Sequence, residues 1–304
     1  MKTASRGIYR QRQRSGFMFI LPALLLLVVF NIYPMLVAFY YSFFDVTIFL
    51  DNPVFVGLGN FYEAMADSRV WNGLKVTFVF TLFEVPFQMV IGLFLAALLT
   101  RNTAFNKLCR NIYFLPIVYS ATAVAIMWRM FLNSNVGLLT YALELIGIKG
   151  INFLNTPGVT LGVLVFISVW RTFGISTVIL LSAMRNVPTE LYESARIDGC
   201  SEFKQFFKIT LPVIRPTVTF VFVTRLIGSL QVFDLIFTTT TGGPNFTTES
   251  LVYYIYTRAF STTNRLGYAS AISLVLFAII LVFTIVLYTF MFSDREQRQG
   301  RRTA

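Results

Sequence analysis

The sequence predicts an all-α integral membrane protein with six transmembrane helices, and two observations carry this prediction. Of its 304 residues, 56% are hydrophobic and only 13% are charged, whereas ordinary soluble domains carry about 25% charged residues. Six mostly apolar runs each reach the roughly 20 residues that a helix needs to cross about 30 Å of hydrocarbon. This composition is typical of a membrane protein and not of a soluble domain with one large core.

The expected spans follow one another with polar loops between them. They are expected at about residues 17–44, 75–99, 111–132, 158–184, 216–239 and 267–292. The first span follows a basic tail at 1–16 and is too long for a cleaved signal peptide. Residues 17–292 would therefore form one transmembrane domain, followed by a polar tail at 293–304. Short helices are expected in two of the loops, at 61–65 and 138–145.

The placement of basic residues sets the expected orientation. Most of the 25 Lys and Arg residues lie in the two terminal tails and in the segments 101–110 and 185–215. Basic loops stay on the cytoplasmic side of a membrane, so these segments and both termini are expected in the cytoplasm. The net charge of +11 is thus a signal of topology, and no nucleic-acid partner is expected.

Residue types that support catalysis and metal binding are scarce. The sequence contains no His, which removes the commonest general base and metal ligand. Cys109 and Cys200 form no metal-type cluster, and their expected cytoplasmic position argues against a disulfide. The G-x-x-x-x-G-K-[ST] loop that cradles nucleotide phosphates is also absent. We therefore expect no enzyme, no metal site and no cofactor on this chain; energy for transport would come from a separate ATPase or an ion gradient.

One charged segment, residues 187–216, lies between two long apolar runs. Thr189 is the expected N-cap of a helix with acidic residues in its first turns. Gly199 is expected to break this helix, and a second helix would end at Leu211-Pro212. These features alone are equally consistent with an amphipathic hairpin that lipid headgroups hold at the interface.

The same segment carries a motif with long, fixed spacing. Glu193-Ser194-Ala195 is followed by three residues and Gly199, and nine residues later by Ile209-Thr210-Leu211-Pro212. This resembles the signature of permease subunits of bacterial ABC importers, which reads Glu-Ala-Ala, three residues, Gly, nine residues, Ile-x-Leu-Pro. The one departure at the fixed positions is Ser194 for the first Ala, a small-for-small change.

The resemblance covers nearly the whole chain, from the first span to the sixth. Asn60-Phe61 and the segments 231–234, 241–244, 254–260 and 267–271 are similar to the carbohydrate branch of the family, the maltose-type and multiple-sugar permeases. The resemblance implies the type I importer permease fold in a bacterial plasma (inner) membrane. It also implies a second, similar permease subunit, two ATPase subunits that bind ATP and Mg²⁺, and an extracellular or periplasmic sugar-binding protein.

The resemblance further assigns the charged segment to docking on the ATPase. In the family, the helix before the glycine sits in a groove of the ATPase. By position, Glu193 would make a charge contact, Ala195 would permit close approach and Gly199 would make the turn. The residues expected to couple to the ATPase are Glu190, Glu193, Ser194, Ala195, Asp198, Gly199, Ile209, Leu211 and Pro212.

Polar residues inside the spans are candidates for the substrate pathway, because charges in a bilayer usually face the protein interior. The candidates are Ser229, Gln231, Val232 and Asp234 in span five, Glu84 and Gln88 in span two, and Trp170 in span four. Gln231 and Asp234 are expected on one helical face, and the resemblance points to Ser229, Gln231 and Val232. Asp234 is equally suited to hold span five to a neighbouring helix, and Trp170 to anchor its span at the interface.

The arginines inside the spans divide into two groups. Arg129 and Arg171 are expected to extend towards a membrane surface, as long basic side chains near span ends do. Arg225 is the one cation expected near the pathway.

These features together predict a permease subunit of an ATP-driven, binding-protein-dependent importer of di- or oligosaccharides. One alternative keeps the architecture but imports a phosphorylated polyol such as glycerol 3-phosphate, which would need a cation in the pathway. A second alternative is an ion-coupled secondary transporter. That class would show matching broken helices in two repeats, and the sequence contains no such pair.

Overall fold

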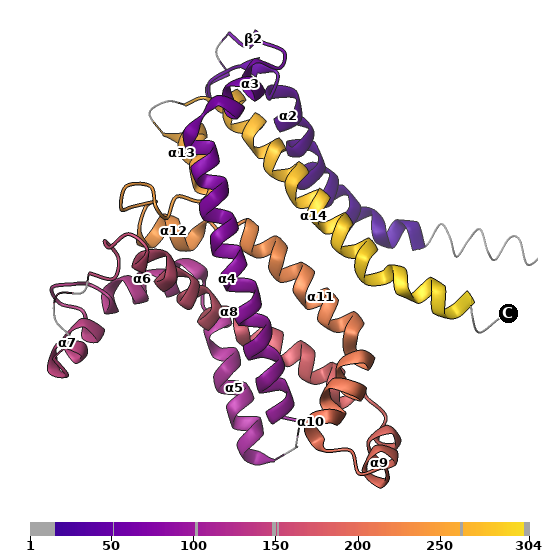
Figure 1. Cartoon of the computed structure of the whole chain (residues 1–304). Coiled ribbons are helices and arrows are strands. Elements are labelled where there is room, and N and C mark those ends of the chain that lie inside the picture. The colour runs from indigo at the N-terminus through magenta and orange to yellow at the C-terminus, as the bar shows by residue number, and fades with distance from the viewer. Residues whose placement is uncertain are drawn as a thin grey trace, which may run out of the picture. The chain divides into compact units, whose positions relative to one another are not determined.

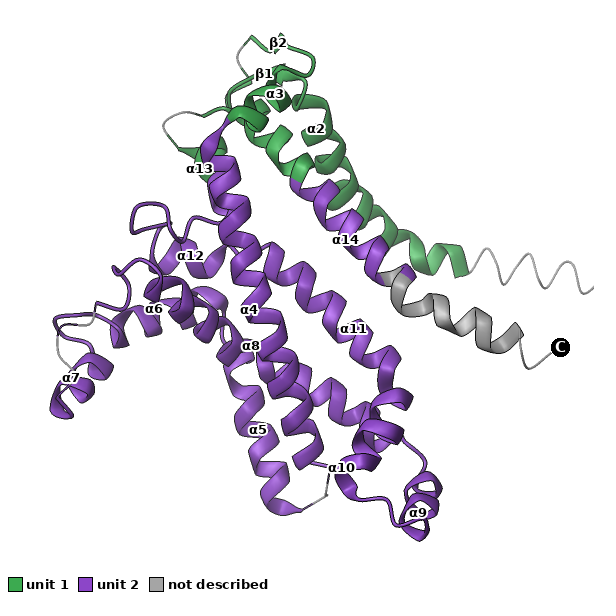
Figure 2. Cartoon of the chain, in the orientation of Figure 1, with its two compact units in different colours: residues 1–66, 255–275 green, residues 67–254, 276–304 purple. Residues whose placement is uncertain are grey.

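The computed structural model describes residues 16–50, 52–100, 103–147, 150, 152–261 and 264–300, most of which are helical. The chain divides into two compact units (Figure 2). Unit 1 comprises residues 1–66 and 255–275, and unit 2 comprises residues 67–254 and 276–304. The predicted basic tail, apart from Gly16, and the final residues 301–304 lie outside the described residues.

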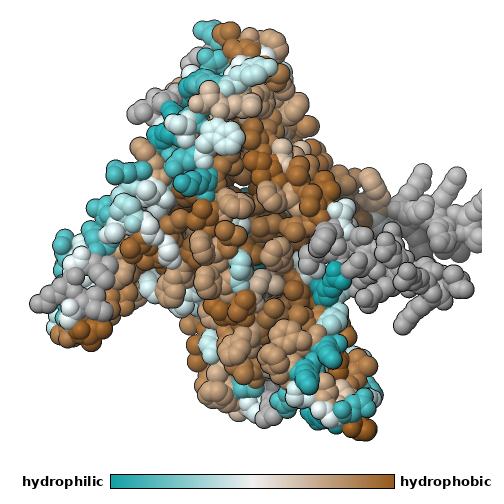
Figure 3. All heavy atoms as spheres, in the orientation of Figure 1, coloured by the Kyte–Doolittle hydropathy of each residue, from teal (hydrophilic) through white to brown (hydrophobic). Residues whose placement is uncertain are grey.

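The membrane-spanning helices agree with the predicted all-α membrane fold. Five helices are long and apolar enough to cross a membrane, and a bent helix pair gives a sixth span if it is counted as one. The five are Gly16–Tyr41, Ser68–Leu98, Val159–Arg185, Glu202–Thr239 and Leu266–Leu287, and the bent pair is Ala104–Val118 with Ala121–Phe131. Apolar side chains cover much of the helical surface in Figure 3, whereas polar side chains gather over α9 and α10.

Unit 1 contains the first span and the turn that follows it. The span includes a π-helical turn, η1 (Val28–Ile32), and continues as α2 (Tyr33–Tyr41); β1 (Phe44–Asp45) then pairs antiparallel with β2 (Val54–Phe55), and α3 (Gly59–Ala66) follows. Asn60 is buried in α3, and its side-chain amide donates to the carbonyl oxygens of Ser42 and Phe44 at 2.9 Å each. This side chain therefore fixes the turn after the first span. The predicted short helix at 61–65 is confirmed as part of α3.

Unit 2 contains the remaining elements up to α12. These are α4 (Ser68–Leu98), α5 (Ala104–Val118), α6 (Ala121–Phe131), α7 (Leu138–Leu145), α8 (Val159–Arg185), α9 (Thr189–Ile197), α10 (Glu202–Gln205), the π-helical turn η2 (Phe206–Thr210), α11 (Leu211–Leu230) and α12 (Asp234–Thr239). Helix α8 packs against α4, α5 and α11, and α12 packs against α6 (Figure 1). Two further helices, α13 (Leu251–Phe260) and α14 (Leu266–Gly300), each contribute residues to both units.

Small residues set the distance between α8 and its neighbours. A Cβ atom on Gly174 would lie 2.0 Å from the carbonyl oxygen of Tyr113 in α5, which is far inside van der Waals contact. Gly92 in α4 is also close to α8, with its Cβ position 3.3 Å from the Cβ of Ser176. Close backbone approach at small residues is a common way to pack helices in a bilayer, where lipid tails remove most of the hydrophobic drive.

The third predicted span is not one straight helix, and this prediction was wrong. Its residues lie in α5 and α6, which meet at an angle of 97°. Tyr119 takes an extended conformation, with ψ of 145°, and Ser120 caps α6 by accepting a hydrogen bond from the Ala123 amide at 3.1 Å. The cap satisfies an amide that the break would otherwise leave without a partner.

The predicted end of a helix at Leu211-Pro212 was also wrong. The chain stays helical from Glu202 through η2 into α11. In η2 the Leu211 amide donates to the carbonyl of Phe206, five residues back. Pro212 lacks an amide hydrogen, so this continuous helix has one donor fewer at that position, and the wider π-helical turn η2 lies directly before it.

A buried ion pair holds the loop before α13 against the start of α4. Glu249 is 1% exposed and accepts from Arg69 Nε at 3.1 Å, and the Arg69 guanidinium lies 3.8 Å from the centre of the Phe246 ring. Asp67, which caps α4 through the Arg69 amide, also accepts a short hydrogen bond from the Tyr254 hydroxyl. Helix α4 consequently begins at Ser68, earlier than the predicted residue 75.

Substituting Gly174 tests the close contact between α5 and α8. Gly174→Ala should lower the midpoint of thermal unfolding, because the new methyl group has to displace the backbone of Tyr113; overpacking of this kind costs about 1–3 kcal/mol or more. The control is Gly162→Ala on the same helix, where nothing lies within 4 Å of the added Cβ. Equal midpoints for the two variants in detergent or nanodiscs would contradict the contact.

Candidate functional site: a polar cavity and an exposed helical hairpin

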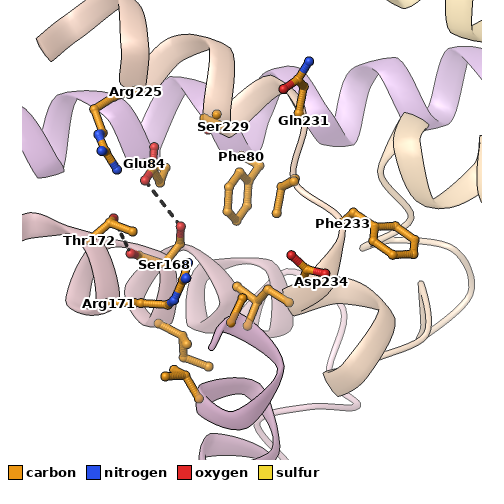
Figure 4. Close-up of a pocket in the computed structure, with 16 residues that line it drawn as sticks. Phe80, Glu84, Ser168, Arg171, Thr172, Arg225, Ser229, Gln231, Phe233 and Asp234 are labelled. Atoms are coloured by element: carbon orange, nitrogen blue, oxygen red, sulfur yellow. Dashed lines mark hydrogen bonds between the residues drawn. The ribbon is translucent and has the colours of Figure 1, made fainter. Parts of the chain in front are cut away.

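A polar cavity of about 200 Å³ lies among the helices of unit 2 (Figure 4). Its walls come from α4, α6, α8, α11 and α12. The lining residues are Phe80, Glu84, Ala121, Val124, Ile167, Ser168, Arg171, Thr172, Arg225, Gly228, Ser229, Gln231, Val232, Phe233, Asp234 and Leu235. Four of these side chains are charged: Glu84, Arg171, Arg225 and Asp234. Such a group is unusual among membrane-spanning helices, because each charged side chain is costly in hydrocarbon.

One end of the cavity is built from charged and hydroxyl side chains of three helices. Glu84 on α4 is 4% exposed and accepts a hydrogen bond from the Ser168 hydroxyl of α8 at 3.3 Å. Arg225 on α11 attracts the Glu84 carboxylate. The Ser229 hydroxyl faces the same carboxylate without closing a hydrogen bond to it.

The other end of the cavity lies at a break between two helices. Helix α11 ends at Leu230, and α12 starts at Asp234. Gln231 and Asp234 are both exposed, and Figure 4 shows them on the walls of the cavity with Phe233 beside them. The prediction that Gln231 and Asp234 share one helical face was wrong, because the helix is interrupted between them, but both residues line the cavity.

Aromatic rings extend from this end of the cavity. The ring of Phe233 stacks on Phe237 with centroids 5.3 Å apart and planes at 22°, and it lies 6.5 Å from the ring of Tyr253. Phe237 is 42% exposed. Flat aromatic faces next to planar amide and carboxylate groups are suited to a ligand that has both hydroxyl groups and apolar C–H faces.

Most of the predicted pathway residues meet at the cavity, and two do not. Glu84, Ser229, Gln231, Val232 and Asp234 all line it. Gln88 is fully buried one turn away, where its amide donates to the Ser176 hydroxyl at 3.1 Å. Trp170 lies in a separate apolar cavity of about 480 Å³, with its ring edge-on to Trp128 at 5.4 Å.

Several residues of the cavity wall were not predicted from the sequence. Arg171 was expected to extend towards a membrane surface, yet it lines the cavity together with Ser168 and Thr172. These three residues have the spacing i, i+3, i+4, which places them on one face of a helix and was the available signal. Phe80 and Phe233 gave no such signal, because Phe occurs 33 times in the chain.

The charged segment forms the predicted helix–glycine turn–helix. Helix α9 ends in a Schellman motif, in which Gly199 (φ of 72°) donates to Arg196 and the Cys200 amide donates to the carbonyl of Ala195 at 2.8 Å. The left-handed conformation explains why a glycine stands at this position. The expected cap at Thr189 was wrong: the N-cap is Pro188, and no side chain caps the helix.

The residues expected to couple to an ATPase lie on an accessible surface. Glu190, Glu193, Ser194, Asp198, Gly199 and Pro212 are exposed, and Ala195, Ile209 and Leu211 are partly exposed. Ile197 and Phe203, which are apolar, are 88% and 74% exposed. The Ser194 hydroxyl donates to the carbonyl of Glu190 within its own helix, so Ser in place of Ala does not alter the surface shape greatly.

Two hydrogen bonds fasten this hairpin to the following span. The hydroxyls of Tyr192 and Thr210 are 2.8 Å apart, and the buried Gln205 amide donates to the carbonyl of Cys200 at 2.7 Å. Thr210 is the last residue of η2, directly before α11. The exposed helix is therefore connected to the same span that lines the polar cavity at its other end.

Spanning helices that enclose a polar cavity and carry an exposed helical hairpin are typical of a transport subunit. Residues 88–293 match the family described as binding-protein-dependent transport system inner membrane component, and the chain belongs to this family. It is therefore a multi-pass membrane permease.

Several curated proteins are similar to nearly the whole chain. The trehalose/maltose transport system permease protein MalF of Thermococcus litoralis is 32% identical over 91% of this chain and 93% of its own length. The lactose transport system permease protein LacF of Rhizobium radiobacter is 31% identical over 98% and 100%. The sn-glycerol-3-phosphate transport system permease protein UgpA of Pectobacterium atrosepticum is 29% identical over 95% and 97%.

A solved structure shares the fold. A chain of a bacterial ABC transporter involved in the import of the acidic polysaccharide alginate superposes with a TM-score of 0.81 at 23% identity, covering 93% of this chain and 98% of that chain. The type I importer permease fold is thereby confirmed. The family assignment also favours the ATP-driven class over an ion-coupled secondary transporter.

The link between α9 and η2 can be tested in the purified protein. Tyr192→Phe removes one hydroxyl and should increase amide hydrogen exchange across Thr189–Ile197 severalfold, since a single hydrogen bond contributes about 0.5–1.5 kcal/mol. The control is Ser194→Ala, which loses a hydroxyl bonded only within α9. If both variants exchange at the rate of the unmodified chain, the Tyr192–Thr210 link does not hold the hairpin.

Proposed function

We propose that the chain is a permease subunit of an ATP-driven, binding-protein-dependent importer of sugars in a bacterial plasma membrane. The observation that carries the proposal is the cavity of unit 2, where hydroxyl, amide and charged side chains adjoin stacked aromatic rings. Relatives named for trehalose/maltose and lactose transport support a saccharide as the substrate.

The permease would work as part of a larger assembly. The proposed partners are a second, similar permease subunit, two ATPase subunits that hold ATP and Mg²⁺, and an external sugar-binding protein. The cavity of about 200 Å³ is smaller than the roughly 300–1,000 Å³ of complete ligand pockets. This is reasonable for a chain that would supply one half of a translocation pathway.

The mechanism links ATP binding to the cavity through α11. Closure of the ATPases would move α9, which the Tyr192–Thr210 hydrogen bond joins to the start of the span. Helix α11 would transmit that motion over its length to the break at Gln231, where the pathway changes from inward-facing to outward-facing. Substrate released by the binding protein would then enter the cavity.

A charge reversal on α9 tests the docking role. Glu193→Lys should reduce ATP-driven uptake at least tenfold while the complex still assembles, because a lysine would meet a basic groove on the ATPase. Uptake and ATP hydrolysis are measured together in proteoliposomes.

The control for this variant is Glu202→Lys, which makes the same charge change at the start of α10, outside the fixed positions of the motif. Transport by Glu193→Lys at the level of the unmodified complex would contradict the docking assignment.

An amide at the break tests the pathway. Gln231→Ala should lower uptake efficiency about fivefold, the effect of losing one neutral hydrogen bond to substrate, without reducing assembly, since Gln231 is exposed. Initial rates of labelled sugar uptake provide the measurement. Thr224→Val on α11, outside the cavity lining, should leave uptake unchanged; uptake equal in both variants would remove Gln231 from the pathway.

A further inference from the structure

Three charged side chains from three different helices meet at one end of the cavity. Figure 4 shows Glu84 from α4, Arg171 from α8 and Arg225 from α11. Arg225 is attracted by Glu84 and repelled by Arg171, so it lies within electrostatic reach of both. Together they carry one excess positive charge.

The remaining carboxylate of the cavity does not balance this excess. Asp234 starts α12 at the opposite end of the cavity, whereas the carboxylate that acts on Arg225 is Glu84. An uncompensated cation is costly at membrane depth, where solvent cannot screen it. The cluster therefore lacks one anion.

The guanidinium groups also have unused hydrogen-bond donors. Within the described part of the chain, neither Arg171 nor Arg225 makes a hydrogen bond or a close ion pair, and the Nε atom of each is buried without a partner. The buried Ser229 hydroxyl faces the Glu84 carboxylate, so these two groups are suited to each other. Buried polar groups are normally satisfied, so the two unpartnered guanidinium Nε atoms mark a place where a ligand completes the bonding.

We infer that the substrate carries an anionic group and that Arg171 and Arg225 bind it. The ligand class is an acidic saccharide, through its carboxylate, or a phosphorylated polyol, through its phosphate. A planar guanidinium fork suits either oxyanion. Glu84 orients Arg225 and accepts a hydrogen bond from a substrate hydroxyl, while the Phe233 ring faces the apolar side of the substrate. This inference rests on the proposed function.

Matched pairs of small molecules test the inference on the purified importer complex in nanodiscs without nucleotide. Galacturonate and galactose differ by a carboxylate in place of a hydroxymethyl group, and glycerol 3-phosphate and glycerol differ by a phosphate. Thermal unfolding is followed as each probe is added. At least one acid should stabilise the complex at a concentration about tenfold or more below that of its neutral partner; which acid does so separates a carboxylate from a phosphate site.

Variants assign the effect to the two arginines. Arg171→Gln and Arg225→Gln should each abolish the preference for the acidic probe. Arg129→Gln removes the same charge from α6 at a residue outside the cavity lining, where Arg129 donates to the carbonyl of Thr238, and should keep the preference.

Two results overturn the inference. The first is that neutral probes bind as well as the acids, which would mean that a carboxylate of the second permease subunit neutralises the cluster. The second is that Arg171→Gln and Arg225→Gln keep the preference for the acidic probe. The proposed function is judged separately by ATP-dependent uptake of a neutral saccharide, maltose, and of an acidic one, digalacturonate, into proteoliposomes with the binding protein. Uptake of either saccharide supports the proposed function. If uptake occurs but no acidic probe is preferred, only the inference is rejected, whereas the absence of both binding and uptake rejects both.

Discussion

The need to satisfy every backbone hydrogen bond in hydrocarbon governs where this chain is able to leave the helix. Lipid offers no partner to a free amide or carbonyl, so an interrupted span must supply substitutes from within the protein. At the break after α11, the carbonyl of Val232 accepts a hydrogen bond from the Ser250 hydroxyl at 2.8 Å, and the Val232 amide donates to the carbonyl of Ser229. The break is therefore stabilised by the loop before α13. That loop in turn depends on the buried Glu249–Arg69 ion pair, because removing one partner would leave a buried charge uncompensated.

The span that contains α11 is irregular at both ends: the π-helical turn η2 precedes α11, and the chain leaves the helix after Leu230. At one end, η2 places a wider helical turn directly before Pro212, and the hydroxyl of Thr210 contacts Tyr192 of the exposed helix α9. At the other end, the chain unwinds at Gln231 and opens onto the cavity. Between them, α11 packs against α4 and α8 as a regular helix. Irregular turns in helices are often found at functional sites, and here one irregularity lies beside each of the two surfaces that a coupled transporter has to connect.

The sequence was sufficient for the helical class, the approximate positions of five of the six spans and the hairpin with its glycine turn, because each of these depends on local signals. Apolar length determines a span, and the left-handed turn at Gly199 requires a residue without a side chain. The bend between α5 and α6 was not predictable in this way. Pro116 was visible, but the chain turns after it, at Tyr119, where the packing of both helices and the Ser120 cap decide the conformation. The apolar residues 111–132 alone predict one continuous span, and tertiary contacts determine that the chain bends within them.

A charged residue within a predicted span indicates a polar environment but does not show where that environment lies. Each charged residue in a span was recognised from the sequence, but its environment depends on which helices become neighbours. Arg171 illustrates this: the tendency of long basic side chains to reach a membrane surface applies when no polar cavity lies nearer, and here α4 and α11 bring Glu84 and Arg225 beside it. The same packing left Gln88, only one helical turn from Glu84, bonded to Ser176 and closed off from the cavity. Of these two polar residues on one helix, Glu84 thus lines the cavity and Gln88 is a packing residue, because a helix face is wider than the cavity that it lines.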